Sequence, residues 1–200
     1  MEKKRAVLLS LLILITASCR GPTTGSVPAH PETTYDEASF DQAIREYSRM
    51  IDRSPDYAEA YVYRGMAYVR KGDYDSAIKD FTKAIEIDPK AGSTYGKRGA
   101  AYLEKGEREA AIRDLTKAIE LYPRFAQAYC NRGNAYLEEG KYTQAVDDFT
   151  VAIEIHPGYA KAYYGRGIAY QKKRLYHLAT QDYRKACDLG EEAACRACGR

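Results

Sequence analysis

The stretch that decides the fold is AEAYVYRGMAYVRKGDYDSAIKDFTKAIEIDP, residues 58–89. At an offset of 34 residues the same pattern returns three more times, so the chain holds four copies, which span 58–91, 92–125, 126–159 and 160–193. A fixed period of this length predicts a stacked array, in which each unit buries its apolar face only against its neighbours.

Each copy predicts two antiparallel helices joined by a short turn. The first helix carries Tyr, Gly and Tyr at its fourth, eighth and eleventh positions, as in Tyr61, Gly65 and Tyr68. These spacings keep all three residues on one face. Because a glycine inside a helix costs about 1 kcal/mol relative to alanine, we expect a partner helix pressed close there, with Ala77 or its equivalent opposite. A glycine such as Gly72 ends the first helix of the first three copies, and a proline stops their second helix.

This pattern closely resembles the tetratricopeptide repeat, with Tyr where that family usually has Trp. The resemblance implies an all-α fold, a right-handed superhelical solenoid of antiparallel helix pairs. It also implies protein or peptide partners, held in the concave groove of the array. Two departures stand out: Arg replaces the usual Leu at the seventh position, and Arg174 and Glu191 replace the turn Gly and the closing Pro of the last copy. Whether that copy turns and ends as the others do is left open.

The ends of the chain lie outside the four copies. Residues 1–18 have a basic head and a short apolar run, which is typical of a signal peptide. The run ends in Thr16-Ala17-Ser18-Cys19, which resembles a bacterial lipoprotein signal and implies lipidation of Cys19, although the family prefers Leu at Thr16 and plain secretion stays an alternative. We expect a membrane-anchored lipoprotein of the bacterial cell envelope, facing the periplasm or the exterior.

Three shorter segments complete the predicted domain organisation. Residues 19–35 are rich in Pro, Gly, Ser and Thr and predict a flexible tether. Residues 36–57 align with the second half of a copy and predict a half repeat with one helix, from Asp36 to about Arg53. Residues 194–200 predict a short capping helix.

Composition and charge exclude several function classes. The chain is 45% hydrophobic and 30% charged, and its net charge of +3 falls to +1 without residues 1–18. We therefore expect no nucleic-acid partner, since such a protein needs a clustered basic face. The three histidines, His30, His156 and His177, stand with no nucleophile and orienting acid at a recognisable spacing. The sequence predicts no enzyme, no cofactor, no metal and no small-molecule substrate.

The resemblance assigns the groove to five positions of each first helix. Among these, ten residues are predicted to bind the partner: Val62, Met66, Arg70, Leu103, Glu104, Asn134, Leu137, Lys161, Tyr164 and Ile168. The alternative is an ordinary solvated face. In the chaperone-binding members of the family a clamp of Lys and Asn grips a terminal carboxylate, but the corresponding pairs here are Val62 with Met66 and Cys130 with Asn134. We therefore expect no co-chaperone function.

The cysteines near the C-terminus allow three interpretations. Cys187, Cys195 and Cys198 could bind zinc with His177, or Cys195 and Cys198 could form a redox pair, and these possibilities make up the alternative function of the chain. Export favours a disulfide instead. The segment KACDLGEEAAC, residues 185–195, resembles the ends of Sel1-like repeats. That resemblance implies a Cys187–Cys195 disulfide with Cys130 and Cys198 reduced; Cys187–Cys198 is the main alternative.

The arginines at the seventh position recur together with aspartates at the twenty-third. In an antiparallel pair, positions whose numbers sum to about 31 lie level, so these two positions meet closely. The sequence predicts a ladder of structural ion pairs, either within each repeat or onto the preceding second helix, with two solvated charges as the alternative. Its members are Arg64, Arg98, Arg132, Arg166, Asp80, Asp114, Asp148 and Asp182.

Overall fold

The computed structural model of the chain describes residues 37–199, which fall within one compact unit, Tyr35–Arg200. The predicted signal peptide, Cys19 and the whole of the predicted tether lie outside this range. All of the regular structure in the described part is helical. Its elements are α2 (Glu37–Arg53), α3 (Ala58–Arg70), α4 (Tyr74–Ile87), α5 (Gly92–Glu104), α6 (Arg108–Leu121), α7 (Ala126–Glu138), α8 (Tyr142–Ile155), α9 (Ala160–Lys172), α10 (Tyr176–Asp188) and α11 (Glu192–Ala197).

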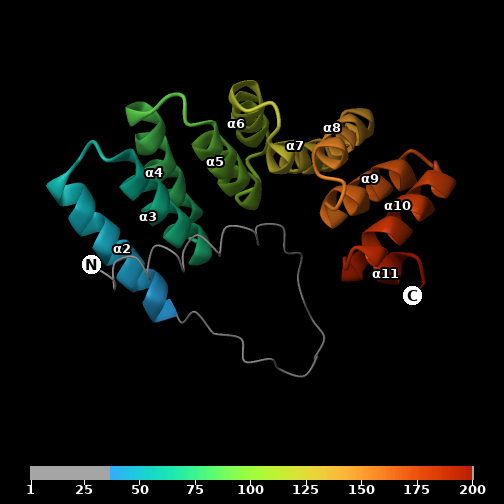
Figure 1. Cartoon of the computed structure of the whole chain (residues 1–200), viewed down its shortest axis with the longest axis horizontal. Helices are drawn as coiled ribbons and strands as arrows, with labels where there is room; N and C mark the ends of the chain where they lie inside the picture. The colour runs from blue at the N-terminus through green and yellow to red at the C-terminus, as the bar shows by residue number, and fades with distance from the viewer. Residues whose placement is uncertain (1–36, 200) are drawn as a thin grey trace. The chain divides into compact units, whose positions relative to one another are not determined.

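The helices pack in the order of the sequence. Each contacts the helix before it and the helix after it, and α7 also contacts α5 and α9. Within this unit the first helices of the repeats, α3, α5, α7 and α9, follow the inner side of an arc, and the second helices follow the outer side (Figure 1). The predicted all-α solenoid of antiparallel helix pairs is confirmed.

The recurring glycine of each first helix marks the closest approach of the two helices in a pair. A Cβ atom on Gly65 would lie 2.8 Å from Cε1 of Phe81, and one on Gly99 would lie 2.8 Å from Cγ of Leu115. The side chain that meets the glycine is therefore the large residue at the twenty-fourth position. The expected alanine also lies across from the glycine, since a Cβ on Gly99 would be 3.3 Å from the backbone oxygen of Ala111, and Ala77 is fully buried. The missing Cβ makes room for a ring or a branched chain, which is why the glycine recurs.

The turn inside each repeat has the same backbone conformation in all four copies. Gly72, Gly106 and Gly140 have φ values of 76°, 79° and 74°, and Arg174 has a φ of 61° in the last copy. The last repeat therefore turns like the others, with a residue whose left-handed conformation costs about 1–2 kcal/mol. Its end differs, because Gly190, with a φ of 93°, terminates α10 one position before the proline of the other copies, which is Glu191 here.

The two ends of the described array differ from the full repeats between them. The half-repeat helix α2 spans Glu37–Arg53, and its predicted start at Asp36 lies outside the described residues. Its Met50 is 41% exposed, whereas the equivalent residue in the full repeats is a buried alanine, because no first helix of its own repeat precedes it within the described residues. The predicted capping helix 194–200 is instead α11, Glu192–Ala197. It starts two residues early because Gly190 ends α10 and leaves Glu191 at the N-cap position.

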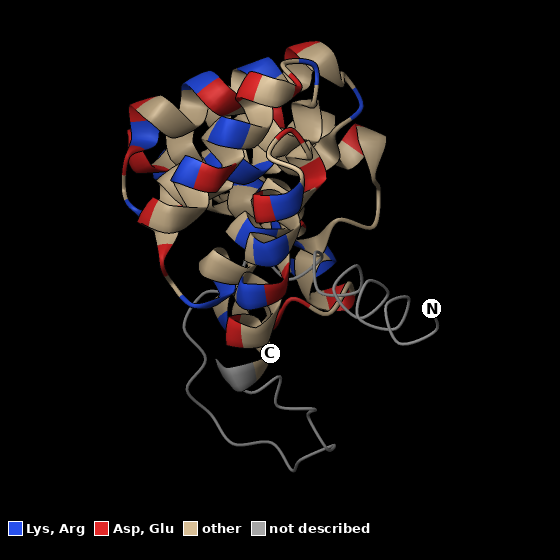
Figure 2. Ribbon diagram, turned by 90° about the vertical axis from the view of Figure 1, so that its left-hand side faces the viewer, with Lys and Arg blue, Asp and Glu red and all other residues tan. Residues whose placement is uncertain are grey.

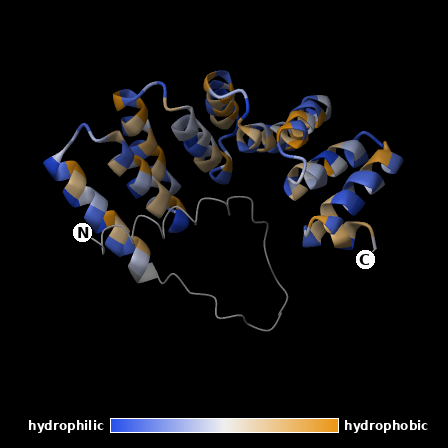
Figure 3. Cartoon of the chain, in the orientation of Figure 1, coloured by the Kyte–Doolittle hydropathy of each residue, from blue (hydrophilic) through white to orange (hydrophobic). Residues whose placement is uncertain are grey.

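The outer surface mixes charges of both signs. Lys and Arg are interspersed with Asp and Glu over the helices (Figure 2). Polar and apolar residues alternate along each helix (Figure 3), as expected for a helix that buries one apolar stripe. Among the helices within residues 37–199, none is long and apolar enough to cross a membrane.

Candidate peptide-binding groove and the contacts that shape it

The apolar residues assigned to the groove are half-buried on the first helices. Val62 and Met66 pack from α3 against the cluster around Phe81, and Leu103 packs from α5 against the cluster around Leu115. Leu137 of α7 contacts the cluster around Phe149, and Ile168 of α9 is also half-buried. Each side chain therefore keeps part of its surface accessible while its other side rests on the core.

The polar residues assigned to the groove are distributed unevenly. Arg70 and Glu104, at the C-terminal ends of α3 and α5, are exposed, whereas Asn134 and Lys161 are half-buried. Together with the apolar side chains they provide an apolar floor and a mixed-charge rim, the composition expected of a surface that accepts a peptide.

Two groove-lining positions, the fifth and the twelfth, also contribute to the packing of the array. In the last repeat these are Tyr164 and Gln171. The Tyr164 ring lies 5.7 Å from the ring of Tyr183, whose hydroxyl donates a 2.7 Å hydrogen bond to Oε1 of Gln171. Burial raises the pKa of Tyr183 to about 12. At the same position as Tyr164, repeat two has Gly96, and the ring of Phe125 lies against it. The sequence did not reveal this aromatic cover.

The seventh-position arginines bind the twenty-third-position aspartates of their own repeat. Arg98 donates from Nε to Oδ2 of Asp114 at 2.7 Å and from Nη2 to Oδ1 at 2.9 Å. This two-pronged geometry is the one in which a guanidinium and a carboxylate interact most strongly. The same pairs of bonds join Arg64 to Asp80, Arg132 to Asp148 and Arg166 to Asp182.

Each arginine also reaches the preceding second helix. Nη1 of Arg98 donates to Oγ1 of Thr82 on α4 at 2.9 Å, and the Thr82 hydroxyl itself donates to the backbone carbonyl of Ile78 on the same helix at 2.7 Å. One guanidinium therefore joins three helices: its own, its partner in the repeat and the one before. Equivalent hydroxyl acceptors are Ser48, Thr116 and Thr150. Sequence reasoning missed these hydroxyls, although they recur sixteen residues before every one of the four arginines.

The arginines are also covered by tyrosine rings. The guanidinium carbon of Arg98 lies 5.7 Å from the centroid of the Tyr95 ring, and the other three arginines stand over the fourth-position tyrosine of their repeats at similar distances. Hydrogen bonding to Asp114 raises the pKa of the Arg98 guanidinium. These charged groups are therefore structural. They hold the first helices, which carry the groove, at one repeated orientation.

A second set of polar contacts links neighbouring repeats at the surface. Lys105 at the end of α5 contacts Asp75 at the start of α4, with Nζ and Oδ1 2.7 Å apart. Contacts of the same thirty-residue spacing join Lys71 to Asp41, Arg108 to Glu138 and Lys173 to Thr143. These side chains are largely exposed, and the chemistry of the partners changes from one junction to the next.

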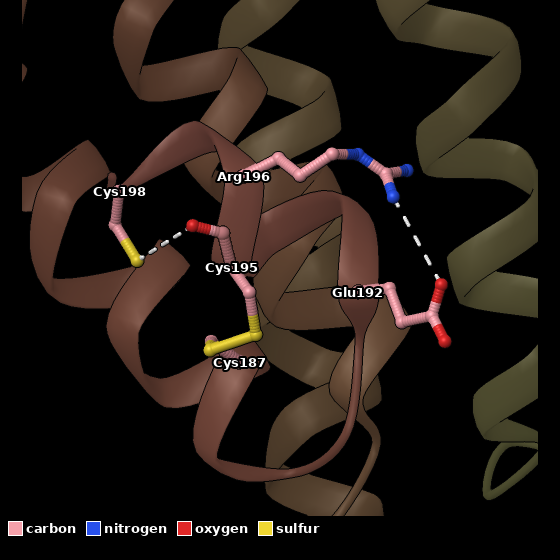
Figure 4. Close-up of a disulfide and its surroundings, with 5 residues drawn as sticks. All are labelled: Cys187, Glu192, Cys195, Arg196 and Cys198. Carbon is pink, nitrogen blue, oxygen red and sulfur yellow. Dashed lines mark hydrogen bonds and ion pairs between the residues drawn. A yellow bond between two sulfur atoms is a disulfide. The ribbon is translucent and has the colours of Figure 1, made fainter. Parts of the chain in front are cut away.

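The C-terminal helix is joined to the array by a disulfide. Cys187 of α10 and Cys195 of α11 are bonded, the pair that the Sel1-like resemblance implies (Figure 4). The thiol of Cys198 donates to the backbone carbonyl of Cys195 at 3.4 Å. Sulfurs in a disulfide are not thiolates and cannot bind zinc as such, so the predicted alternative metal site would first require reduction. Within residues 37–199, no group of three or more His, Cys, Asp and Glu side chains could hold a metal ion.

Comparisons with known proteins agree with this geometry. Family models described as tetratricopeptide repeat match residues 58–91 and 160–191, and one described as TPR repeat matches 99–140 and 133–173. A solved structure of the MamA protein is 31% identical over 79% of this chain and 86% of its own, with a TM-score of 0.70. The chain belongs to the tetratricopeptide repeat (TPR) family. The matched residues run through all four repeats.

Other solved TPR structures resemble the chain to a similar degree. A crystal structure of MamA has a TM-score of 0.72 at 29% identity, over 84% of this chain and 99% of that one. The structure of YrrB, described as a TPR protein with an unusual peptide-binding site, has a TM-score of 0.68 at 26% identity, over 80% and 84%. A search of curated proteins returned no match. TPR proteins of this kind are typically scaffolds that bind peptides or proteins, not enzymes.

Proposed function

We propose that this TPR protein is a scaffold of the bacterial cell envelope, exported, anchored by a lipid on Cys19, and binding a segment of a partner protein in the groove of its first helices. The observation that carries the binding role is the apolar stripe of Met66, Leu103, Leu137 and Ile168. It supplies one half-buried apolar side chain from each consecutive first helix. Apolar anchors of this kind usually dominate binding energy.

The arginine contacts support a preformed groove. Because Arg98 ties α5 to both α4 and α6, the first helix cannot tilt without breaking hydrogen bonds to Asp114 and Thr82. A surface that is ordered before binding loses less conformational entropy when the partner docks. The array is therefore suited to holding an extended or helical segment without rearrangement.

Substitutions in the stripe test the groove. A partner captured from membranes with the full-length protein should bind Leu137→Ala and Met66→Ala variants about tenfold or more weakly, since each removes an apolar anchor. Val151→Ala is the matched control, because Val151 is a half-buried apolar residue on the second helix α8, at a position where the three other repeats carry exposed lysines. Unchanged affinity in both stripe variants, with melting temperatures like that of the control, would show that the groove is not the binding surface.

The lipid anchor is supported by the sequence alone. A basic head, an apolar run and small residues converge on Cys19, which lies outside the described residues. One acyl chain binds membranes only marginally and several together anchor stably. Metabolic labelling with a fatty-acid analogue should mark the native protein, and the label should disappear in Cys19→Ser. Equal labelling of the two proteins would refute the anchor.

A further inference from the structure

The turn between α6 and α7 forms a cleft with the start of α5. Its volume is about 420 Å³, and it is lined by Ser93, Tyr122, Pro123, Arg124 and Phe125. This volume lies in the range of pockets that accept small ligands or single large side chains. Most of the lining is apolar, and its residues with polar side-chain groups are Ser93, Tyr122 and Arg124.

Two glycines of α5 create the room for the aromatic walls. A Cβ on Gly92 would lie 2.6 Å from Cδ2 of Tyr122, and a Cβ on Gly96 would lie 2.7 Å from Cε1 of Phe125. Any larger residue would displace a ring. Gly96, which lies inside α5, costs the helix about 1 kcal/mol relative to alanine.

The other repeats show that the array does not need this arrangement. At the two glycine positions they carry Ala58 and Val62, Ala126 and Cys130, and Ala160 and Tyr164. Their inter-repeat turns close with no such pair of glycines. The two glycines of repeat two are therefore explained by the placement of the two rings and not by the turn itself.

The cleft is only partly used by the fold. Tyr122 remains 48% exposed although its ring is held against the backbone of α5. Arg124 is exposed and makes no ion pair with another described residue. The first turn of α5 contains no acidic residue, and Ala91 provides no side-chain cap. Among the residues that line the cleft, the one charged side chain is therefore the Arg124 cation.

We propose that this cleft anchors a peptide segment of a partner protein in which an aromatic or large aliphatic residue stands beside Asp or Glu. The apolar side chain enters between the rings of Tyr122 and Phe125. The neighbouring carboxylate pairs with the Arg124 guanidinium and accepts a hydrogen bond from the Ser93 hydroxyl. The inference rests on the proposed function, since Ser93 stands at a groove-lining position and the segment would continue from the cleft into the groove.

Two short peptides test the predicted chemistry. The acidic probe is acetyl-Gly-Glu-Trp-Glu-Gly-amide and the basic probe is acetyl-Gly-Lys-Trp-Lys-Gly-amide, with blocked ends so that only side chains differ in charge. The protein contains no tryptophan, so tryptophan fluorescence reports on the probe alone. We expect the acidic probe to bind and the basic probe to bind at least about tenfold more weakly, as a lost charge-assisted hydrogen bond would cause.

Variants locate the site on the protein. Arg124→Glu and Tyr122→Ala should each weaken binding of the acidic probe about tenfold, whereas Arg113→Glu, an equal charge reversal on the exposed face of α6, should not. Thermal melting checks that all three variants are folded. Equal binding of the two probes, no binding of the acidic probe, or the same affinity in native protein and Arg124→Glu overturns the proposal.

Chemical shifts of the backbone amides in NMR spectra distinguish binding of the acidic probe in the cleft from binding in the groove. Binding in the cleft should shift the amides of Ser93 and Phe125 first. Shifts confined to Leu103 and Leu137 would keep the groove and reject the cleft. Conversely, the acidic probe could still bind in the cleft while the Leu137→Ala and Met66→Ala variants keep full affinity for the captured partner. That result would reject the groove as proposed above.

Discussion

Two sets of charged contacts join neighbouring helices, and they differ in how constant their residues are. The buried set repeats the same chemistry four times: Arg98 with Asp114 and Thr82 has its equivalent in every copy, apart from Ser48 in place of Thr. The surface set keeps only the thirty-residue spacing. Lys105 at the fourteenth position meets Asp75, but at the next junction the acidic Glu138 at the thirteenth position meets Arg108.

Exposure explains this difference. Side chains of Arg98 and Asp114 are 16% and 10% exposed, against 44% and 50% for Arg108 and Glu138. A charge withdrawn from water must find partners in one geometry, because leaving it unpaired is costly. An exposed charge can exchange its partner for water with little change in free energy. Burial therefore restricts which residues can occupy a position, and exposure does not.

The largest effect is expected from breaking a buried pair. Asp114→Ala leaves the Arg98 guanidinium without its carboxylate and should lower the free energy of unfolding by about 3–5 kcal/mol. Glu107→Ala is the control, because it removes an exposed carboxylate from the turn between α5 and α6, the helix pair that also holds Asp114. Chemical denaturation measures both, and similar losses in the two variants would show that burial does not distinguish the sets.

The disulfide comes next, because it acts at the end of the array. Replacing Cys187 and Cys195 by Ser should remove at most about 2–3 kcal/mol, since the closed loop is short. The loss should appear as faster hydrogen exchange in α11 and the last turn of α10, with α5–α8 unaffected. Peptide mapping under non-reducing conditions identifies the bond itself; free thiols at both positions in the oxidised protein would contradict it.

A smaller effect is expected from the hydroxyl that completes the buried set. Thr116→Val removes the acceptor of the 3.0 Å bond from Nη1 of Arg132 and should cost about 1–3 kcal/mol. Thr143→Val makes the same substitution at an exposed threonine that accepts from Lys173. If both variants melt alike, the hydroxyl adds nothing to the arginine–aspartate pair.

The smallest effect is expected on the surface. Arg108→Gln breaks the ion pair with Glu138 and should change the free energy of unfolding by less than about 1 kcal/mol, with a change that shrinks further as salt is added. Denaturation at low and high salt measures it. A loss as large as that of Asp114→Ala would erase the distinction between the two sets of contacts.

Much of the architecture could be predicted from periodicity. The 34-residue period, the glycines that end first helices and the prolines that end second helices predicted the helix pairs, because these features act through local backbone conformation. The arginine–aspartate pairs could also be predicted, since two helices joined by a short turn have a simple register. Local rules were weakest at the end of the chain, where α11 begins two residues before the predicted start.

Contacts between repeats could not be predicted in the same way. The hydroxyl of Thr82 lies on α4 and meets an arginine of the next repeat, and the ring of Phe125 comes from the turn that leads into the following repeat. Both depend on the angle at which one helix pair stacks on the next. The repeat pattern specifies which faces are buried, but this angle results from the combined packing of many side chains, so the partners across each junction follow from the assembled array.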